Sequence, residues 1–142
     1  MFRIVNERRT QIVDLHARVL LARRKRGAPD SDREFIPLKL ERESVTFFPL
    51  SWTIVHPIDA ESPLREYKGA QGLRECDSEF LILLNGFDET FSQTVHTRSS
   101  YRGAEVVWGA RFQNMFNPPA EDGTISINIR KIHEIEPAPL QA

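Results

Sequence analysis

The chain has 142 residues, of which 40% are hydrophobic and 27% are charged, and its formal net charge is -1. This size and composition are typical of an ordinary globular protein, so we expect residues 1–142 to form a single domain that needs no metal or disulfide to fold. A net charge near zero excludes the overall positive field on which nucleic-acid binding draws, and no nucleic-acid partner is expected.

Two further observations narrow the class of protein. Cys76 is the only cysteine, which excludes an intrachain disulfide and is typical of a reducing compartment. The longest apolar run, residues 80–84, is far shorter than the ~20 residues that span a bilayer, so we expect a soluble chain. Basic residues gather near the amino terminus, where we expect any electrostatic partner to bind. They are Arg3, Arg8, Arg9, Arg18, Arg23, Arg24, Lys25 and Arg26.

Alternating apolar and polar residues predict β-strands in several segments. In residues 11–21 the odd positions are apolar, and Asp14 falls on the polar face of the predicted strand. Residues 36–40, 48–54 and 125–129 show the same alternation. All four segments are therefore expected to form strands with one solvated face.

Residues 80–84 are apolar on both faces, which predicts a central strand covered by a facing sheet or by another subunit. Residues 27–32 form a polar break rich in turn-forming residues. Pro37 and Pro49 cannot donate to a strand ladder, so we expect them at sheet edges, strand starts or bulges.

Turn and helix signals are few. Asp122-Gly123 predicts a hairpin turn before the strand at 125–129, and a change of phase near Lys131 predicts a bend or bulge. Ser62-Pro63 opens the one predicted helix, which Gly69 and Gly72 keep to one or two turns.

Many short strands, frequent turns and little helix predict an all-β fold. The expected architecture is an immunoglobulin-like β-sandwich with one or two short helical turns. The tail at residues 137–142, which contains two prolines, is expected to be loose.

Several segments, in this order and spanning nearly the whole chain, resemble the cytoplasmic domain of inward-rectifier potassium channels of prokaryotic type. They are residues 12–18 (IVDLHAR), 53–64 (TIVHPIDAESPL), 84–90 (LNGFDET), 93–101 (QTVHTRSSY), 107–112 (VWGARF) and 132–135 (IHEI). The family's two membrane helices and its potassium filter sequence do not occur here, so the chain looks like a fragment of a channel.

The resemblance implies a role and partners. It implies a gating and pore-lining domain at the cytoplasmic face of the inner membrane, with three identical subunits completing a homotetramer around an aqueous axis. Potassium would be the permeant ion, with no cofactor, and lipid or ligand binding would be coupled to gating. The transmembrane pore region would be contributed by parts of the channel that are missing from this chain.

The resemblance also assigns pore residues. Asp14 matches the acidic position that faces the cytoplasmic pore, and Asn85 stands where eukaryotic members carry a second acid, so we expect a weaker cation trap here. Residues 85–94 match the gating loop, in which Gly86 would permit positive φ and Phe87 would form an apolar constriction. Two plainer alternatives stay open: Asp14 is an ordinary solvated carboxylate, and Asn85-Gly86 is a simple hairpin turn.

Two further pairs are candidates. Arg8 and Arg9 match the basic pair that meets anionic lipid such as phosphoinositide, although ordinary surface arginines would look the same. Glu89 and Arg98 flank the loop and are predicted to pair within or between subunits, a contact worth only ~0 to 1 kcal/mol if exposed. Ala110 departs from the family, whose members usually carry histidine at that position.

No catalytic or metal pattern occurs in the chain. The four histidines share no short ligand spacing, and no nucleophile motif or glycine-rich phosphate loop is present. We therefore expect no enzyme activity, no cofactor and no metal site. The alternative functions are a cytosolic immunoglobulin-like protein-binding module without a pore and, less favoured, an enzyme with a sparse site.

Overall fold

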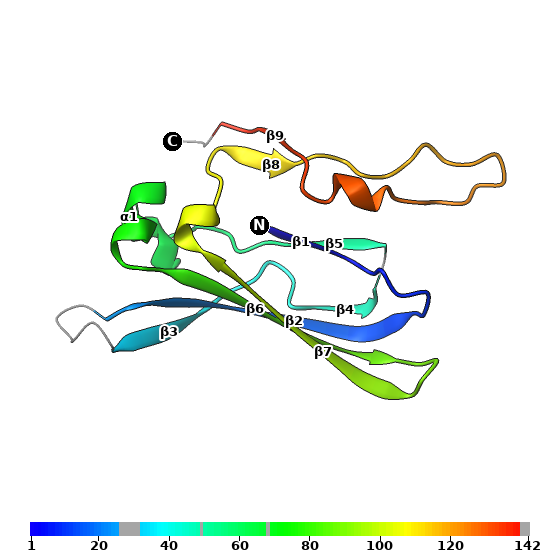
Figure 1. Ribbon diagram of the computed structural model, residues 1–142, viewed down its shortest axis with the longest axis horizontal. Coiled ribbons are helices and arrows are strands. Elements are labelled where there is room, and N and C mark those ends of the chain that lie inside the picture. The colour runs from blue at the N-terminus through cyan, green and yellow to red at the C-terminus, as the bar shows by residue number, and fades with distance from the viewer. Residues whose placement is uncertain (26–31, 49, 68, 140–142) are drawn as a thin grey trace.

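A computed structural model describes residues 1–25, 32–48, 50–67 and 69–139. Its strands form antiparallel sheets that pack against one another (Figure 1), with one short α-helix and three 3-10 turns among the described residues. The elements in chain order are β1 (Phe2–Val5), β2 (Ile12–Arg24), β3 (Arg33–Leu38), β4 (Ser44–Phe47), β5 (Ser51–Ile54), η1 (Pro63–Glu66), α1 (Ala70–Glu75), β6 (Glu79–Asp88), β7 (Gln93–Arg102), η2 (Gly103–Glu105), β8 (Ala110–Phe112), η3 (Ile129–Lys131) and β9 (Ile135–Pro137). The predicted all-β sandwich is confirmed.

The largest sheet has the strand order β3-β2-β6-β7, and β4 also pairs with β2. Strand β2 is long enough to pair with β4 near its start and with β3 near its end, while β6 runs along its other side. Odd residues of β2 from Val13 to Leu21 are buried, as the alternation predicted. The apolar run at 80–84 lies in β6, between β2 and β7, so the prediction of a central strand is also confirmed.

The second layer is the β1–β5 pair, which lies along one face of the large sheet in Figure 1. Trp52 and Ile54 of β5 are buried and join Val19, Leu21 and Ile82 of the large sheet in one core. A fully buried valine, leucine or isoleucine side chain contributes roughly 1.5 to 3 kcal/mol of hydrophobic stabilisation. Within the part of the chain that the structure describes, no helix has the length and apolar character needed to cross a bilayer.

The predicted helix start is confirmed, because the backbone N–H of Leu64 donates to Ser62 Oγ at 3.1 Å. The helix is a single 3-10 turn, and the two glycines do not end it as expected. Gly69 instead caps a separate helix, α1, which contains Gly72. Pro37 lies in β3 at the edge of the large sheet, as predicted.

The predicted strand at residues 125–129 is wrong. Only one isolated bridge forms there, between Phe116 and Ile127, and Ile125 is exposed. Alternation alone makes no strand when no long neighbour pairs with it, and this segment has none among the described residues. The turn before it does form, with Gly123 at φ 82°, and the expected bend near Lys131 is the 3-10 turn η3.

Two other boundaries differ from expectation. The predicted strand at 48–54 is shorter than expected: only Ser51–Ile54 forms a strand, β5, while the preceding strand β4 ends at Phe47 and belongs to another sheet. Pro137, expected at the start of the loose tail, belongs instead to β9, and the N–H of Ala138 donates to the carbonyl of Gly109 at 2.8 Å. Pro49, most of the polar break at 27–32 and residues 140–142 lie outside the described residues.

Arg3 joins the two ends of the chain. Its guanidinium donates to the carbonyl of Lys131 at 2.6 Å, to that of Ile132 at 2.8 Å and to that of Gln113, and it lies 4.5 Å from the ring centroid of Phe112. The planar guanidinium group, which has five N–H donors, is suited to bind three backbone carbonyls at once. Strand β1 is thereby fastened to the carboxyl-terminal β8–β9 region.

Arg3→Met should lower the free energy of unfolding by about 1 to 3 kcal/mol, because three carbonyls lose a charged donor while the aliphatic stem is kept. Urea denaturation followed by tryptophan fluorescence measures this change. The matched control is Arg42→Met, which alters an exposed arginine in a loop and should change stability by less than about 0.5 kcal/mol. Equal effects of the two substitutions would contradict the role of Arg3.

Candidate functional site

The centre of the candidate site is a β-bulge in β2. The register between β2 and β6 shifts between Val13 and His16, so that Asp14 and Leu15 together oppose Gly86. Asp14 has φ 48°, a left-handed value that aspartate tolerates better than most residues. Leu15 is buried and Asp14 is exposed, so the bulge directs the carboxylate away from the core.

The bulge brings predicted pore residues together. Asn85 is exposed on β6 and pairs with His16 on one side and His96 on the other. Phe87, two residues further along β6, is 39% exposed. Asp14, Asn85 and Phe87 therefore lie close together on the exposed side of the large sheet, a placement that the separate sequence segments could not show.

Gly86 lies on the other side of the sheet, which corrects one expectation. It is buried, and its φ is not among the positive values, so it does not provide a left-handed turn. A Cβ built there would lie 2.6 Å from Ile12 Cγ2 and 3.2 Å from Leu15 Cδ1. Glycine is required because β6 approaches the bulged strand too closely for a side chain.

The hairpin alternative for Asn85-Gly86 is also wrong. Both residues lie within β6 and pair with β7, and the turn between the two strands occupies residues 89–92. Ser92 in that turn has φ 49°. The tip of the predicted gating loop is thus displaced toward the carboxyl end of the segment that the sequence indicated.

Asp88 holds this tip in place and was not anticipated. Its side chain is fully buried, and its two oxygens accept four hydrogen bonds. Oδ1 accepts from the backbone N–H groups of Thr90 at 3.0 Å and Phe91 at 3.3 Å. Oδ2 accepts from Thr10 Oγ1 at 2.8 Å and from the Arg8 guanidinium at 3.0 Å.

The environment of Asp88 shifts its acidity. Burial alone would raise its pKa, but the hydrogen bonds from Thr10, Phe91 and Thr90 and the charge of Arg8 outweigh burial and lower the pKa below its usual value. The group therefore stays ionised in the folded protein. One carboxylate connects the amino-terminal segment to the β6–β7 turn.

The two arginines predicted to meet lipid are placed differently. Arg8 is paired with Asp88 and its side chain is 46% exposed. Arg9 is exposed, and among the described residues no hydrogen bond or ion pair involves it. The sequence predicts the same role for both arginines, but in the structure only Arg8 forms an ion pair with Asp88.

The predicted pair of Glu89 and Arg98 does not form within the chain. Arg98 lies opposite Leu83, and Glu89 is six residues beyond Leu83, in the turn. At a rise of about 3.4 Å per residue the two are separated by roughly 20 Å along the sheet. Pairing between subunits stays a prediction.

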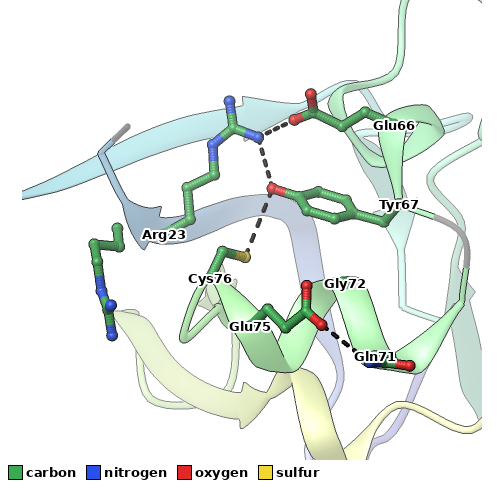
Figure 2. A pocket seen from close by; sticks show the side chains of 8 residues that line it. Arg23, Glu66, Tyr67, Gln71, Gly72, Glu75 and Cys76 are labelled. Carbon is green, nitrogen blue, oxygen red and sulfur yellow. Dashed lines mark hydrogen bonds and ion pairs between the residues drawn. The ribbon is translucent and has the colours of Figure 1, made fainter. Parts of the chain in front are cut away.

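A second polar cluster lies at the far end of β2, beside a pocket (Figure 2). Arg23 donates to Glu34 at 2.7 Å, to Tyr67 Oη at 2.7 Å and to Glu66, and the Cys76 thiol lies 3.7 Å from Tyr67 Oη. Burial raises the pKa of Tyr67, and the hydrogen bond from Arg23 opposes this effect. The cluster fastens β2 to β3 and η1, and no short sequence motif signals it.

Among the residues that the structure describes, no three histidine, cysteine or carboxylate side chains converge in a way that could hold a metal ion. What the bulge offers instead is an exposed carboxylate beside an amide and an aromatic ring.

Comparison with known proteins gives this surface a context. Residues 1–141 match the family described as inward rectifier potassium channel C-terminal domain. The chain is 37% identical over 136 residues to the inward rectifier potassium channel Kirbac3.1 of Paramagnetospirillum magnetotacticum, a match that covers 95% of this chain and 45% of that protein.

Human channels are also similar. The chain is 38% identical over 121 residues to the ATP-sensitive inward rectifier potassium channel 14 of Homo sapiens, covering 80% of this chain and 27% of that protein. It is 34% identical over 142 residues to the human G protein-activated inward rectifier potassium channel 3, covering 94% of this chain and 35% of that protein. The chain spans less than half the length of each of these relatives.

These matches place the chain among the carboxyl-terminal domains of ion channels. It belongs to the inward rectifier potassium channel C-terminal domain family, as its sequence segments indicated. The relatives are channels and not enzymes, which confirms the prediction that the chain has no catalytic role.

Gly86→Ala should destabilise the domain by about 1 to 3 kcal/mol, because the added methyl overlaps Ile12 in a packed core. Thermal or urea unfolding checks this value. Asn85→Ala, at the next position but exposed, is the control and should stay within about 0.5 kcal/mol of the parent chain. A neutral Gly86→Ala would show that the sheet has room at the bulge.

The lowered pKa of Asp88 predicts acid sensitivity. A carboxyl whose folded pKa lies below its unfolded value, about 3.9, stabilises the fold fully above that value and loses the contribution as pH falls through the folded pKa. The free energy of unfolding of the parent chain should therefore fall as the pH drops below about 4, and in Asp88→Asn this fall should be less steep. Denaturation midpoints measured from pH 7 to pH 2.5 test this, and an unchanged slope would contradict it.

Proposed function

We propose that this chain is the cytoplasmic gating and pore-lining domain of a tetrameric inward-rectifier potassium channel. Four copies surround an aqueous axis, and the face that carries Asp14 and Asn85 looks toward it. Potassium ions pass along this axis on the cytoplasmic side of the membrane. The membrane pore is contributed by the remainder of the channel.

The observation that carries this proposal is the exposed carboxylate at the bulge, in a chain that belongs to a potassium-channel family. A bulge interrupts regular pairing and re-aims a side chain, here that of Asp14. Four copies of Asp14 around a narrow conduit would reinforce one another's field and raise the local cation concentration. With Asn85 as a neutral neighbour, each subunit supplies one carboxylate at this level.

Phe87 is the proposed constriction. Its ring is partly exposed beside Asp14, and its neighbours across the strands are Val13 on β2 and Thr94 on β7. An apolar ring of four such side chains closes a pore by excluding water, and a small rotation of each sheet reopens it. Glu89 of one subunit and Arg98 of another are proposed to fix the spacing of adjacent loops.

Lipid or ligand binding is proposed to bias this movement from the amino-terminal end. Arg8 and Arg9 lie in the segment between β1 and β2, and both side chains reach solvent. Guanidinium groups suit phosphate through their planar donors, and each basic residue near an anionic surface contributes about 1 kcal/mol of attraction. In this proposal the domain lies at the cytoplasmic face of the inner membrane with its basic end toward the headgroups.

Asp14→Asn in the full-length channel tests the pore assignment. Removing four carboxylates from the conduit should reduce potassium conductance or block by internal cations several-fold, with the larger effect at low ionic strength because salt screens the field. Single-channel recording in planar bilayers measures both. Glu61→Gln, which removes an exposed carboxylate elsewhere on the chain, is the control and should leave currents unchanged. Unchanged currents in Asp14→Asn would remove Asp14 from the pore.

A further inference from the structure

Asp88 is a buried carboxylate for which the proposed pore has no use. Its side chain is 0% exposed, yet its pairing partner, Arg8, is 46% exposed and open to solvent. A buried charge needs a counter-charge as well as hydrogen bonds, because burial without them is costly. Among its four donors Arg8 is the only charged one, since the others are Thr10 and two backbone N–H groups.

Arg8 therefore has two possible partners. In the structure its guanidinium lies on Asp88 Oδ2 at 3.0 Å, while its exposed side remains within reach of an anionic group from solvent. The adjacent Arg9 is exposed and has no partner among the described residues. A phosphate that approaches Arg9 would compete directly with Asp88 for Arg8.

We propose that Asp88 is a positioning residue that withholds Arg8 from anionic phosphate, and that Arg8 passes from Asp88 to the phosphate when the domain binds it. This inference rests on the proposed lipid contact and adds its regulation. Arg9 makes the first contact, and Arg8 completes the site at the expense of its internal ion pair.

The exchange reaches the gating loop through Asp88 itself. The same carboxylate accepts the N–H groups of Thr90 and Phe91, which shape the β6–β7 turn. When Arg8 leaves, Asp88 keeps its charge but loses its counter-charge, and the turn that depends on it is held less firmly. Coupling of this kind is reciprocal, so loosening the turn must also favour phosphate binding by the same factor.

Vesicle binding by this chain tests the exchange. Asp88→Asn keeps the size of the side chain but no longer holds Arg8 by charge. It should bind vesicles of phosphatidylcholine with 5% phosphatidylinositol bisphosphate about fivefold more tightly than the parent chain, the equivalent of about 1 kcal/mol for one freed arginine. Glu7→Gln removes the same charge from an exposed neighbour of Arg8 and controls for net charge. The double variant Arg8→Gln/Asp88→Asn should lose the gain.

The outcomes are distinct. Equal affinities of Asp88→Asn and Glu7→Gln would overturn the exchange and leave the lipid contact standing. Absence of vesicle binding in the parent chain and in every variant would overturn both, while the pore assignment of Asp14 would be unaffected. If soluble inositol trisphosphate shows the same fivefold gain as the vesicles, the exchange holds and the phosphate is taken from solution.

A second measurement needs no substitution. Hydrogen exchange of the Thr90 and Phe91 amides in the parent chain should become several-fold faster when the phosphoinositide vesicles are added, because Asp88 loses Arg8. A merely structural Asp88 would leave these rates unchanged on lipid binding. Unchanged or slower exchange with bound lipid would overturn the proposal even if Asp88→Asn failed to fold.

Discussion

The close pairing of β2 with β6 at the bulge is the constraint on which the rest of the site depends. Two residues of β2 must fit opposite Gly86, and they fit only because glycine leaves space for Ile12 and Leu15. Of these two residues, Leu15 turns into the core and Asp14 turns out of it. A single local irregularity thus places a charge on an otherwise regular sheet without disturbing the sandwich beneath.

Contacts between distant segments tie the amino-terminal part of the domain to the rest of the fold. Arg3 fastens β1 to carbonyls near the carboxyl end, and Arg8, only a few residues later, reaches Asp88 at the end of β6. The basic amino-terminal segment is therefore bound on both sides to the parts of the chain that it would regulate. In the proposed exchange, a charge that binds this segment would act on the Arg8–Asp88 ion pair as well as on the surface.

Much of the fold could be predicted because periodicity reports burial directly. The alternation in β2 and the doubly apolar run in β6 each follow from which faces meet the core. The same rule failed at residues 125–129, where Ile125 alternates with polar neighbours but stays exposed, since a strand also needs a partner. Asp14 and Asn85 were identified by resemblance, whereas Asp88 was passed over because nothing in its neighbourhood marks a carboxylate as buried.

The sequence by itself determined the all-β class, the family and the polar face on which Asp14 lies, because these depend on local pattern and on ordered motifs. Tertiary structure alone decided that Gly86 serves packing instead of a turn, that Arg8 and Arg9 differ, and that Asp88 joins two distant segments. The physical reason is that hydrogen bonds and steric contacts between residues about 80 positions apart depend on strand register. Register is set by the packing of the whole sheet and not by any one segment.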